Sequence, residues 1–150
     1  MQNIQGEVVQ LEQFVPYRMV HLAANISLGL SKIYKDEFDI TIAQWRVLAQ
    51  LAAQQKLYSK DISNITSMDK SKVSRAVKTL ESKGYLYKVT DKKDNRAAYL
   101  SLTTQGKTLY QKIAPKALQW ERQLIAVLEQ GEHKKLMEIL EKLDKQVLLI

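Results

Sequence analysis

The change of hydrophobic period at Gly84 is the feature of this sequence that most restricts its fold. Before Gly84, apolar residues follow the three- and four-residue spacing of an amphipathic helix, at Val73, Ala76, Val77 and Leu80. After it, residues 85–90 and 98–102 are rich in β-formers and alternate, with polar residues 91–96 between them. Glycine itself suits the left-handed position that ends a helix. The sequence therefore predicts a helix from an Asp69 cap to Lys83, followed directly by a β-hairpin.

Helical spacing predicts further elements on both sides of this unit. The expected helices run from about Gln10 to Tyr34, from a cap within Asp39–Thr41 through Ala52, from a Ser59 cap to about Ile65, from a Thr103 or Thr104 cap to about Leu128, and from beyond Gly131 to about Val147. Pro115 lies inside the fourth of these and is expected to bend it near Lys112, because proline removes a backbone donor and crowds the preceding turn.

The order of elements predicts a mainly α (α+β) fold. Helices followed by a two-stranded hairpin form a winged helix-turn-helix, here expected as the DNA-binding lobe at residues 37–107 of a single domain, 1–150. The flanking segments, 1–36 and 108–150, have long apolar helix faces. So small a lobe cannot bury all of this apolar surface. We therefore expect these N- and C-terminal helices to be dimerisation helices of a homodimer.

The excess positive charge lies in the middle of the chain. Between Gln55 and Lys107 basic residues outnumber acidic ones, and this segment carries the whole formal net charge of +7, since the two signs balance elsewhere. A basic face on a neutral scaffold is typical of a protein that binds a polyanion. A lysine-rich solvated surface would have the same composition.

The predicted helix after Asp69 carries the candidate reader of bases. Its outward residues can donate hydrogen bonds to base edges and phosphates in the major groove, and they are Lys70, Ser71, Lys72, Ser74, Arg75 and Lys78. Ser59 and Lys60 begin the preceding helix, where free backbone N–H groups attract phosphate. An amphipathic helix with a merely basic exterior is the alternative.

The predicted hairpin turn is the second candidate DNA contact. Its members are Lys92, Lys93, Asn95 and Arg96. Arg96 suits the narrow minor groove, where the negative potential is enhanced, and the lysines suit phosphates. A solvated turn whose charges pair at the surface is the alternative.

Four motifs in this order resemble the MarR family of bacterial winged helix regulators. They are residues 43–48, residues 68–75, residues 80–86, and the turn 91–96 with its Asp-Asn-Arg triplet, which closes on 102–106. The resemblance implies a homodimer that binds operator DNA, usually a repressor released by a small ligand. It also implies that Ser71, Ser74, Arg75 and Lys78 face the groove and that Arg96 lies at the wing tip.

The sequence also predicts a small-molecule site. Family members that sense small molecules tend to bind them between the dimerisation helices and the DNA-binding lobe, and the candidate residues there are Tyr17, Arg18, His21, Trp45 and Arg46. An arginine could pair with a carboxylate while the aromatic rings enclose a ring, so the expected effector is a small aromatic carboxylate. Trp45 also fits a core position, and Arg18 and His21 fit an ordinary helix surface.

Other functions find little in the sequence. The two histidines, His21 and His133, are far apart and no cysteine exists, so we expect no metal site. The chain shows no phosphate-binding glycine loop and no nucleophile motif, so we expect no enzyme and no cofactor. No signal peptide or membrane span is apparent, which favours a cytoplasmic protein. The alternative function is a winged helix that binds protein or RNA, although the central aromatic residues look scattered rather than clustered on one strand face.

Overall fold

The computed structural model describes residues 5–90, 92–93 and 97–150. The chain consists of two compact units, Met1–Ile113 and Ala114–Ile150. The elements, in chain order, are η1 (Leu11–Gln13), α1 (Val15–Phe38), α2 (Ile42–Gln54), β1 (Leu57–Tyr58), α3 (Ser59–Thr66), α4 (Lys70–Ser82), β2 (Leu86–Thr90), β3 (Ala98–Leu102), α5 (Thr104–Ile125) and α6 (Glu132–Val147). No helix among these described residues is long and apolar enough to cross a membrane.

The helices confirm the expected order and correct several of its boundaries. α1 begins at Val15, not near Gln10, because Pro16 in its first turn has a preset φ and needs no intrahelical partner for its nitrogen. It continues past Tyr34 to Phe38, where Asp39 adopts a left-handed conformation with a φ of 53°. α5 runs through Pro115 and ends at Ile125, short of the expected Leu128.

Side-chain caps explain where the central helices begin. Thr41 caps α2 through a reciprocal box: Gln44 N donates to Thr41 Oγ1 and Thr41 N donates to Gln44 Oε1, each at 3.2 Å. Asp69 caps α4 as expected. The prediction that Ser59 caps α3 is wrong: Tyr58 holds that position, and its backbone N–H donates to Asp61 Oδ2 at 3.1 Å.

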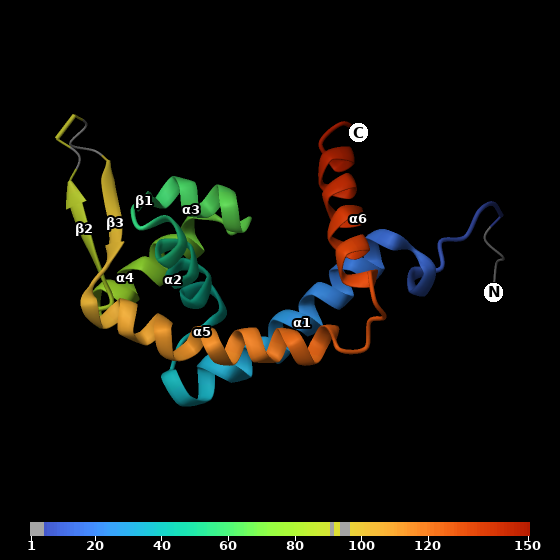
Figure 1. The fold of residues 1–150 in the computed structure, drawn as a ribbon. Coiled ribbons are helices and arrows are strands. Elements are labelled where there is room, and N and C mark those ends of the chain that lie inside the picture. Colours follow the sequence, from blue (N-terminus) through green and yellow to red (C-terminus); the bar gives the residue numbers. More distant parts are fainter. Residues whose placement is uncertain (1–4, 91, 94–96) are drawn as a thin grey trace. The chain divides into compact units, whose positions relative to one another are not determined.

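The hairpin forms as predicted and gains one more strand. β2 and β3 pair antiparallel from Leu86 opposite Leu102 to Thr90 opposite Ala98. β1, which has two residues, pairs with the other edge of β3, so the order is β1-β3-β2. In Figure 1 the hairpin projects away from the helices of its unit. A two-residue strand has too little periodicity to be predicted from sequence.

The core of the first unit lies between the central helices and the inner face of the sheet. Its fully buried side chains include Leu48, Ile62, Leu80, Leu100 and Ile113, drawn from α2, α3, α4, β3 and α5. Burying one leucine or isoleucine stabilises a fold by about 1.5–3 kcal/mol. These residues therefore hold the helices and the hairpin together as one packed unit.

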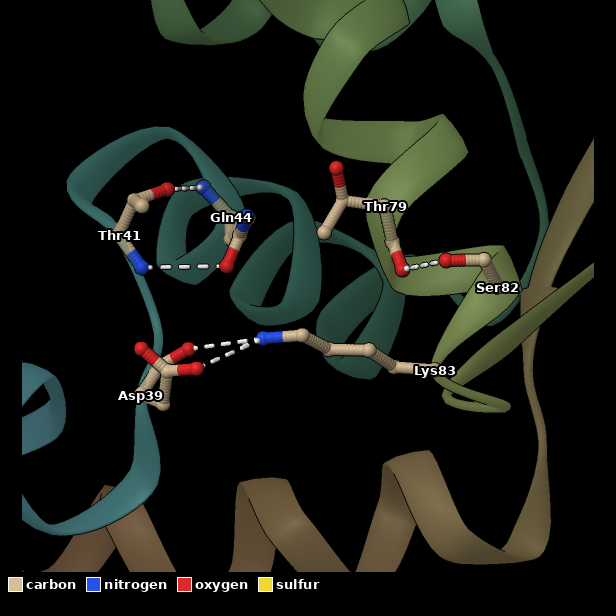
Figure 2. A network of polar contacts seen from close by, with 6 residues as sticks. All are labelled: Asp39, Thr41, Gln44, Thr79, Ser82 and Lys83. Atoms are coloured by element: carbon tan, nitrogen blue, oxygen red, sulfur yellow. Dashed lines mark hydrogen bonds and ion pairs between the residues drawn. The ribbon is translucent and has the colours of Figure 1, made fainter.

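Two close contacts fix the C-terminal end of α4 and the start of α5. At Gly106, a Cβ atom would lie 1.9 Å from the backbone oxygen of Tyr85, so only glycine allows this approach of α5 to the chain entering β2. At the other contact, Lys83 Nζ donates to the backbone oxygen of Asp39 at 3.0 Å and lies 3.4 Å from its carboxylate (Figure 2). Lys83 thereby joins the end of α4 to the connection between α1 and α2.

Candidate nucleic-acid interface

α4 separates an apolar face from a basic one. Its inward residues Val73, Ala76, Val77 and Leu80 are each at most 4% exposed. The residues predicted to read DNA are all exposed: Lys70, Ser71, Lys72, Ser74, Arg75 and Lys78. At 3.6 residues per turn, Ser71, Ser74, Arg75 and Lys78 form one row opposite the buried stripe. Neither Lys70 nor Lys78 forms an ion pair with any residue of the described ranges, so both charges face solvent.

The start of α4 is fixed by the Asp69 carboxylate. Asp69 Oδ1 accepts from Lys72 N at 2.8 Å and from Ser71 Oγ at 2.7 Å. The backbone hydrogen bond from Lys72, the hydroxyl of Ser71 and then the nearby positive charges of Lys72 and Arg75 lower the pKa of Asp69. The cap is therefore ionised at neutral pH and holds Ser71 at the first turn of the outward row.

The turn before α4 sets its angle to α3. Ser67 adopts a left-handed conformation with a φ of 55°, which ends α3. Ser63 Oγ donates to the backbone oxygen of Met68 at 2.6 Å, and the Met68 side chain is buried. Ser59 and Lys60 lie exposed at the first turn of α3. This is a helix-turn-helix with α4 as its second helix.

The wing is only partly described. Lys92 and Lys93 lie exposed between β2 and β3. Asn95 and Arg96, the other predicted wing contacts, fall outside the described residues, so their DNA roles remain predictions from sequence. β2 and β3 pair in antiparallel register up to Thr90 and Ala98, the residues that precede and follow this turn.

The outer face of the sheet corrects one expectation. The register places Tyr58, Tyr99 and Val89 in one row, and Ser101 and Tyr87 in the next row on the same face. The rings of Tyr58 and Tyr99 contact each other at a tilt of 35° with centroids 4.4 Å apart, and Lys56 Nζ lies 3.8 Å from the Tyr99 centroid. The central aromatics are therefore clustered on a strand face, not scattered. The sequence concealed this because the pairing of Tyr58 depends on the unpredicted β1.

The five residues predicted around a ligand form separate groups. Tyr17 and His21 stack on α1 with centroids 5.8 Å apart, and both are exposed, as is Arg18. Trp45 is half-buried, and its ring lies 5.5 Å from that of Tyr34 and 5.9 Å from that of Tyr110.

Arg46 Nη2 instead approaches Ser27 Oγ at 3.4 Å. Burial raises the pKa of Tyr34, and the nearby Arg46 charge opposes that rise, so the Tyr34 phenol stays neutral at physiological pH. Among the described residues, no ring contact or hydrogen bond joins the Tyr17–His21 pair to the Trp45 stack.

Known proteins share both this sequence and this fold. Residues 38–97 match the model of the MarR family. An uncharacterized HTH-type transcriptional regulator of Bacillus cereus (strain ATCC 10987) is 30% identical over 122 residues, 81% of either chain. The solved structure of a MarR/EmrR family transcriptional regulator from Acinetobacter sp. ADP1 superposes with a TM-score of 0.86 at 30% identity, over 95% of this chain and 100% of that one. The chain belongs to the MarR family.

The wider MarR fold includes DNA-bound members. A MarR family regulator from Streptomyces coelicolor, solved in complex with DNA, has a TM-score of 0.82 at 20% identity and covers 96% of this chain and 92% of its own. At that identity the likeness concerns the fold alone. The protein is thus a MarR-family transcriptional regulator with a winged helix fold, and its relatives are regulators, not enzymes. Among the described residues, no group of three or more acidic, histidine or cysteine side chains is placed to hold a metal ion.

Proposed function

We propose that this MarR-family regulator is a repressor that binds a pseudo-palindromic operator as a homodimer. The observation that carries the proposal is the exposed basic face of α4, where Lys70 and Lys78 lack carboxylate partners in the described chain. Arg75 can pair with guanine O6 and N7, and the serines of the row can donate to bases or phosphates. α3 would contact the backbone through Ser59 and Lys60, and the wing through Lys92, Lys93, Asn95 and Arg96.

Exposed apolar surface supports the homodimer. The first half of α1 exposes Val15, Tyr17, Met19 and Val20, and α6 exposes Leu136, Ile139, Leu143 and Val147. Such faces favour association, and a two-fold axis would present two copies of α4 to two half-sites about one helical turn apart. We accordingly propose that residues 1–36 and 108–150 act in dimerisation and residues 37–107 in DNA binding. Chromosomal DNA as the partner implies a cytoplasmic location.

A small-molecule response is the second part of the proposal. Of two proteins with the same fold, the PcaV regulator from Streptomyces coelicolor was solved with its natural ligand, and the DNA binding of Bordetella bronchiseptica BpsR is regulated by 6-hydroxynicotinic acid. By analogy we propose a small aromatic carboxylate as effector. The candidate residues for it, named from the sequence, are Tyr17, Arg18, His21, Trp45 and Arg46.

The proposal is tested by titrating the protein against duplex DNA from the region upstream of its own gene and against a scrambled duplex. Affinity for both should fall steeply with salt, with a log-log slope of about −0.9 per phosphate contact.

Arg75→Ala should lose about 1–3 kcal/mol of binding free energy on the operator and discriminate less between operator and scrambled duplex. Arg96→Ala should weaken both duplexes evenly and reduce the slope by roughly one. Lys32→Ala, an exposed α1 lysine, serves as control.

The outer face of the sheet, which carries Tyr58, Tyr87 and Tyr99, favours one alternative function, the binding of single-stranded RNA. Aromatic rings with neighbouring lysines stack unpaired bases without reading sequence. The same titration with a single-stranded oligonucleotide separates the two functions. If single strands bind more tightly than any duplex, and Tyr99→Ala abolishes that binding while Arg75→Ala leaves it unchanged, the duplex-operator proposal is wrong.

A further inference from the structure

The end of α4 contacts the residue that ends α1 (Figure 2). Lys83, the C-cap of α4, donates from Nζ to the backbone oxygen of Asp39, the C-cap of α1, at 3.0 Å. Residues 80–86 carry part of the family resemblance, yet none of them belongs to the α4 row proposed to read DNA. We propose that Lys83 is a positioning residue. Its link to Asp39 fixes α4 relative to α1 and thereby sets the half-site spacing that the dimer accepts.

Backbone hydrogen bonds hold the Lys83 end of this link. Lys83 N donates to the oxygen of Thr79 at 3.0 Å, and the next residue, Gly84, adopts a left-handed conformation with a φ of 82°. Tyr85 N then donates to the oxygen of Leu80 at 2.9 Å, which closes the end of α4 in a Schellman motif. The Lys83 side chain therefore starts from a fixed point of the backbone.

The Asp39 end of the link is fixed in the same way. Asp39 has a left-handed φ of 53°, and its N–H donates to the oxygen of Lys35 at 3.1 Å. Ile40 N donates to the oxygen of Tyr34 at 3.1 Å, and the side chains of Ile40 and Tyr34 are at most 1% exposed. The Lys83 ammonium is therefore bonded to a backbone atom that cannot turn away as a flexible side chain can.

The backbone oxygen of Asp39, rather than its carboxylate, is the stronger partner of Lys83. The carboxylate lies 3.4 Å from Lys83 Nζ, and the Asp39 side chain is 97% exposed, so solvent screens this ion pair. The Lys83 side chain is only 34% exposed, and its hydrogen bond to the backbone oxygen is charge-assisted. The link should therefore survive loss of the carboxylate and fail on loss of the ammonium group.

The link acts on the geometry of DNA binding. α1 and α4 each pack against α2, and Lys83 adds a direct connection between their ends. The consequence for DNA rests on the proposed function, in which α1 lies in the dimer interface and α4 in the major groove. One base pair more or less between half-sites rotates one of them by about 34° around the duplex. A fixed α4 rejects that rotation, whereas a loosely held one tolerates it.

The first test measures spacing selectivity on the duplex that the upstream DNA supplies, with one base pair inserted or removed at its centre. The parent should prefer the native spacing by about tenfold or more. Lys83→Met should bind the native duplex about tenfold more weakly, as for loss of a charged hydrogen bond, and should bind all three duplexes within about threefold of one another. Its affinity for a scrambled duplex should change by no more than about twofold.

Two matched variants isolate the link. Lys112→Met removes the same charge close by, since both lysines line one cleft, and Lys112 forms no ion pair with a described residue. Asp39→Asn removes the carboxylate but keeps the backbone oxygen, and asparagine suits the left-handed conformation. Both variants should keep the spacing selectivity of the parent.

The second test needs no DNA and does not depend on the proposed function. The chain has no cysteine, so Lys32→Cys on α1 and Lys78→Cys on α4 provide unique positions for nitroxide labels. Double electron–electron resonance measures the distance between the labels, with excess unlabelled protein present to suppress distances between chains. The distribution should be narrow in the parent, broader with Lys83→Met and unchanged with Lys112→Met. Circular dichroism shows whether each variant is folded, and Lys83→Gln replaces Lys83→Met if that variant does not fold.

Several results would overturn the inference. Parental spacing selectivity and label distances in Lys83→Met would do so, even where the parent binds operator as proposed. Equal losses in Lys83→Met and Lys112→Met would reduce the effect to charge, and an equal loss in Asp39→Asn would place the anchor in the exposed carboxylate. If the parent binds no duplex, the regulator proposal fails, and the label distances alone decide whether Lys83 fixes α4 relative to α1.

Discussion

α4 and α6 are both amphipathic helices, yet their apolar faces have opposite environments. In α4, Val73, Val77 and Leu80 are at most 2% exposed within the chain. In α6 no residue is buried, and Leu136, Ile139 and Leu143 remain 41–42% exposed. The comparison shows that an apolar stripe predicts a helix and predicts which of its faces will be buried. It does not predict whether that face is buried against the same chain or against another one.

The difference has an energetic meaning for the two helices. α4 is stabilised by burial against α2, α3 and β2, so its basic row can stay in solvent. α6 obtains little of that stabilisation from its own unit, and isolated helices of its length are marginal in water. The homodimer proposed above would supply the missing contacts.

The largest effect is expected from charges on the exposed face of α6. Leu140→Glu combined with Leu143→Glu should convert a dimer to a monomer and abolish measurable operator binding, because one half-site offers too little surface for tight recognition. Analytical ultracentrifugation measures the assembly and a duplex titration measures binding. Lys142→Glu, a charge change on the same helix, is the control. A double variant that stays dimeric would exclude this face from the interface.

Shortening a buried leucine in α4 should have a different signature from shortening an exposed one in α6. Leu80→Ala should cost about 2–5 kcal/mol of unfolding free energy at every protein concentration, as for a cavity in a packed core. Leu143→Ala should shift unfolding by an amount that depends on protein concentration, since dimerisation and folding are then coupled. Urea unfolding at several concentrations distinguishes them. Equal, concentration-independent losses would contradict the comparison.

Gly106→Ala tests the backbone contact that fixes α5 to the hairpin. The added methyl group would meet the Tyr85 backbone oxygen at 1.9 Å, and backbone cannot move aside as a flexible side chain can. We expect a loss of about 1–3 kcal/mol in unfolding free energy, typical of overpacking. Gln111→Ala, exposed on the same helix, should be nearly neutral. A Gly106→Ala protein as stable as its parent would show that this approach is not tight.

The smallest effect is expected at the Asp69 cap, and it should depend on pH. The pKa of Asp69 is lowered by hydrogen bonds from Lys72 N and Ser71, so the stabilisation is complete above the unfolded-state pKa, near 3.8. It is lost as the pH falls through the still lower folded-state value. Asp69→Asn keeps an uncharged cap, so its deficit against the parent should shrink in that acidic window. Thermal unfolding across pH checks this, and a pH-independent deficit would contradict it.

The hydrophobic periodicity, together with residues that cap or end helices, was enough to predict most elements of this fold. The Asp69 cap, the Gly84 end of α4, the hairpin and the Gly131 start of α6 follow from local chemistry, and the structure confirms them. The outward row of α4 was predictable for the same reason, because a helix with one apolar face must expose the other. Boundaries that depend on a single residue, such as Pro16 and Tyr58, were predicted less well.

The sequence alone determined the local elements, the basic middle of the chain and the family resemblance, since each rests on neighbours within a few turns or strands. Only the tertiary structure gathered Tyr58, Tyr87 and Tyr99 on one sheet face and brought Lys83 against the backbone of Asp39. These groups join residues up to 44 positions apart, from different parts of the chain. Their meeting depends on strand register and core packing, which are set by long-range contacts that no local pattern records.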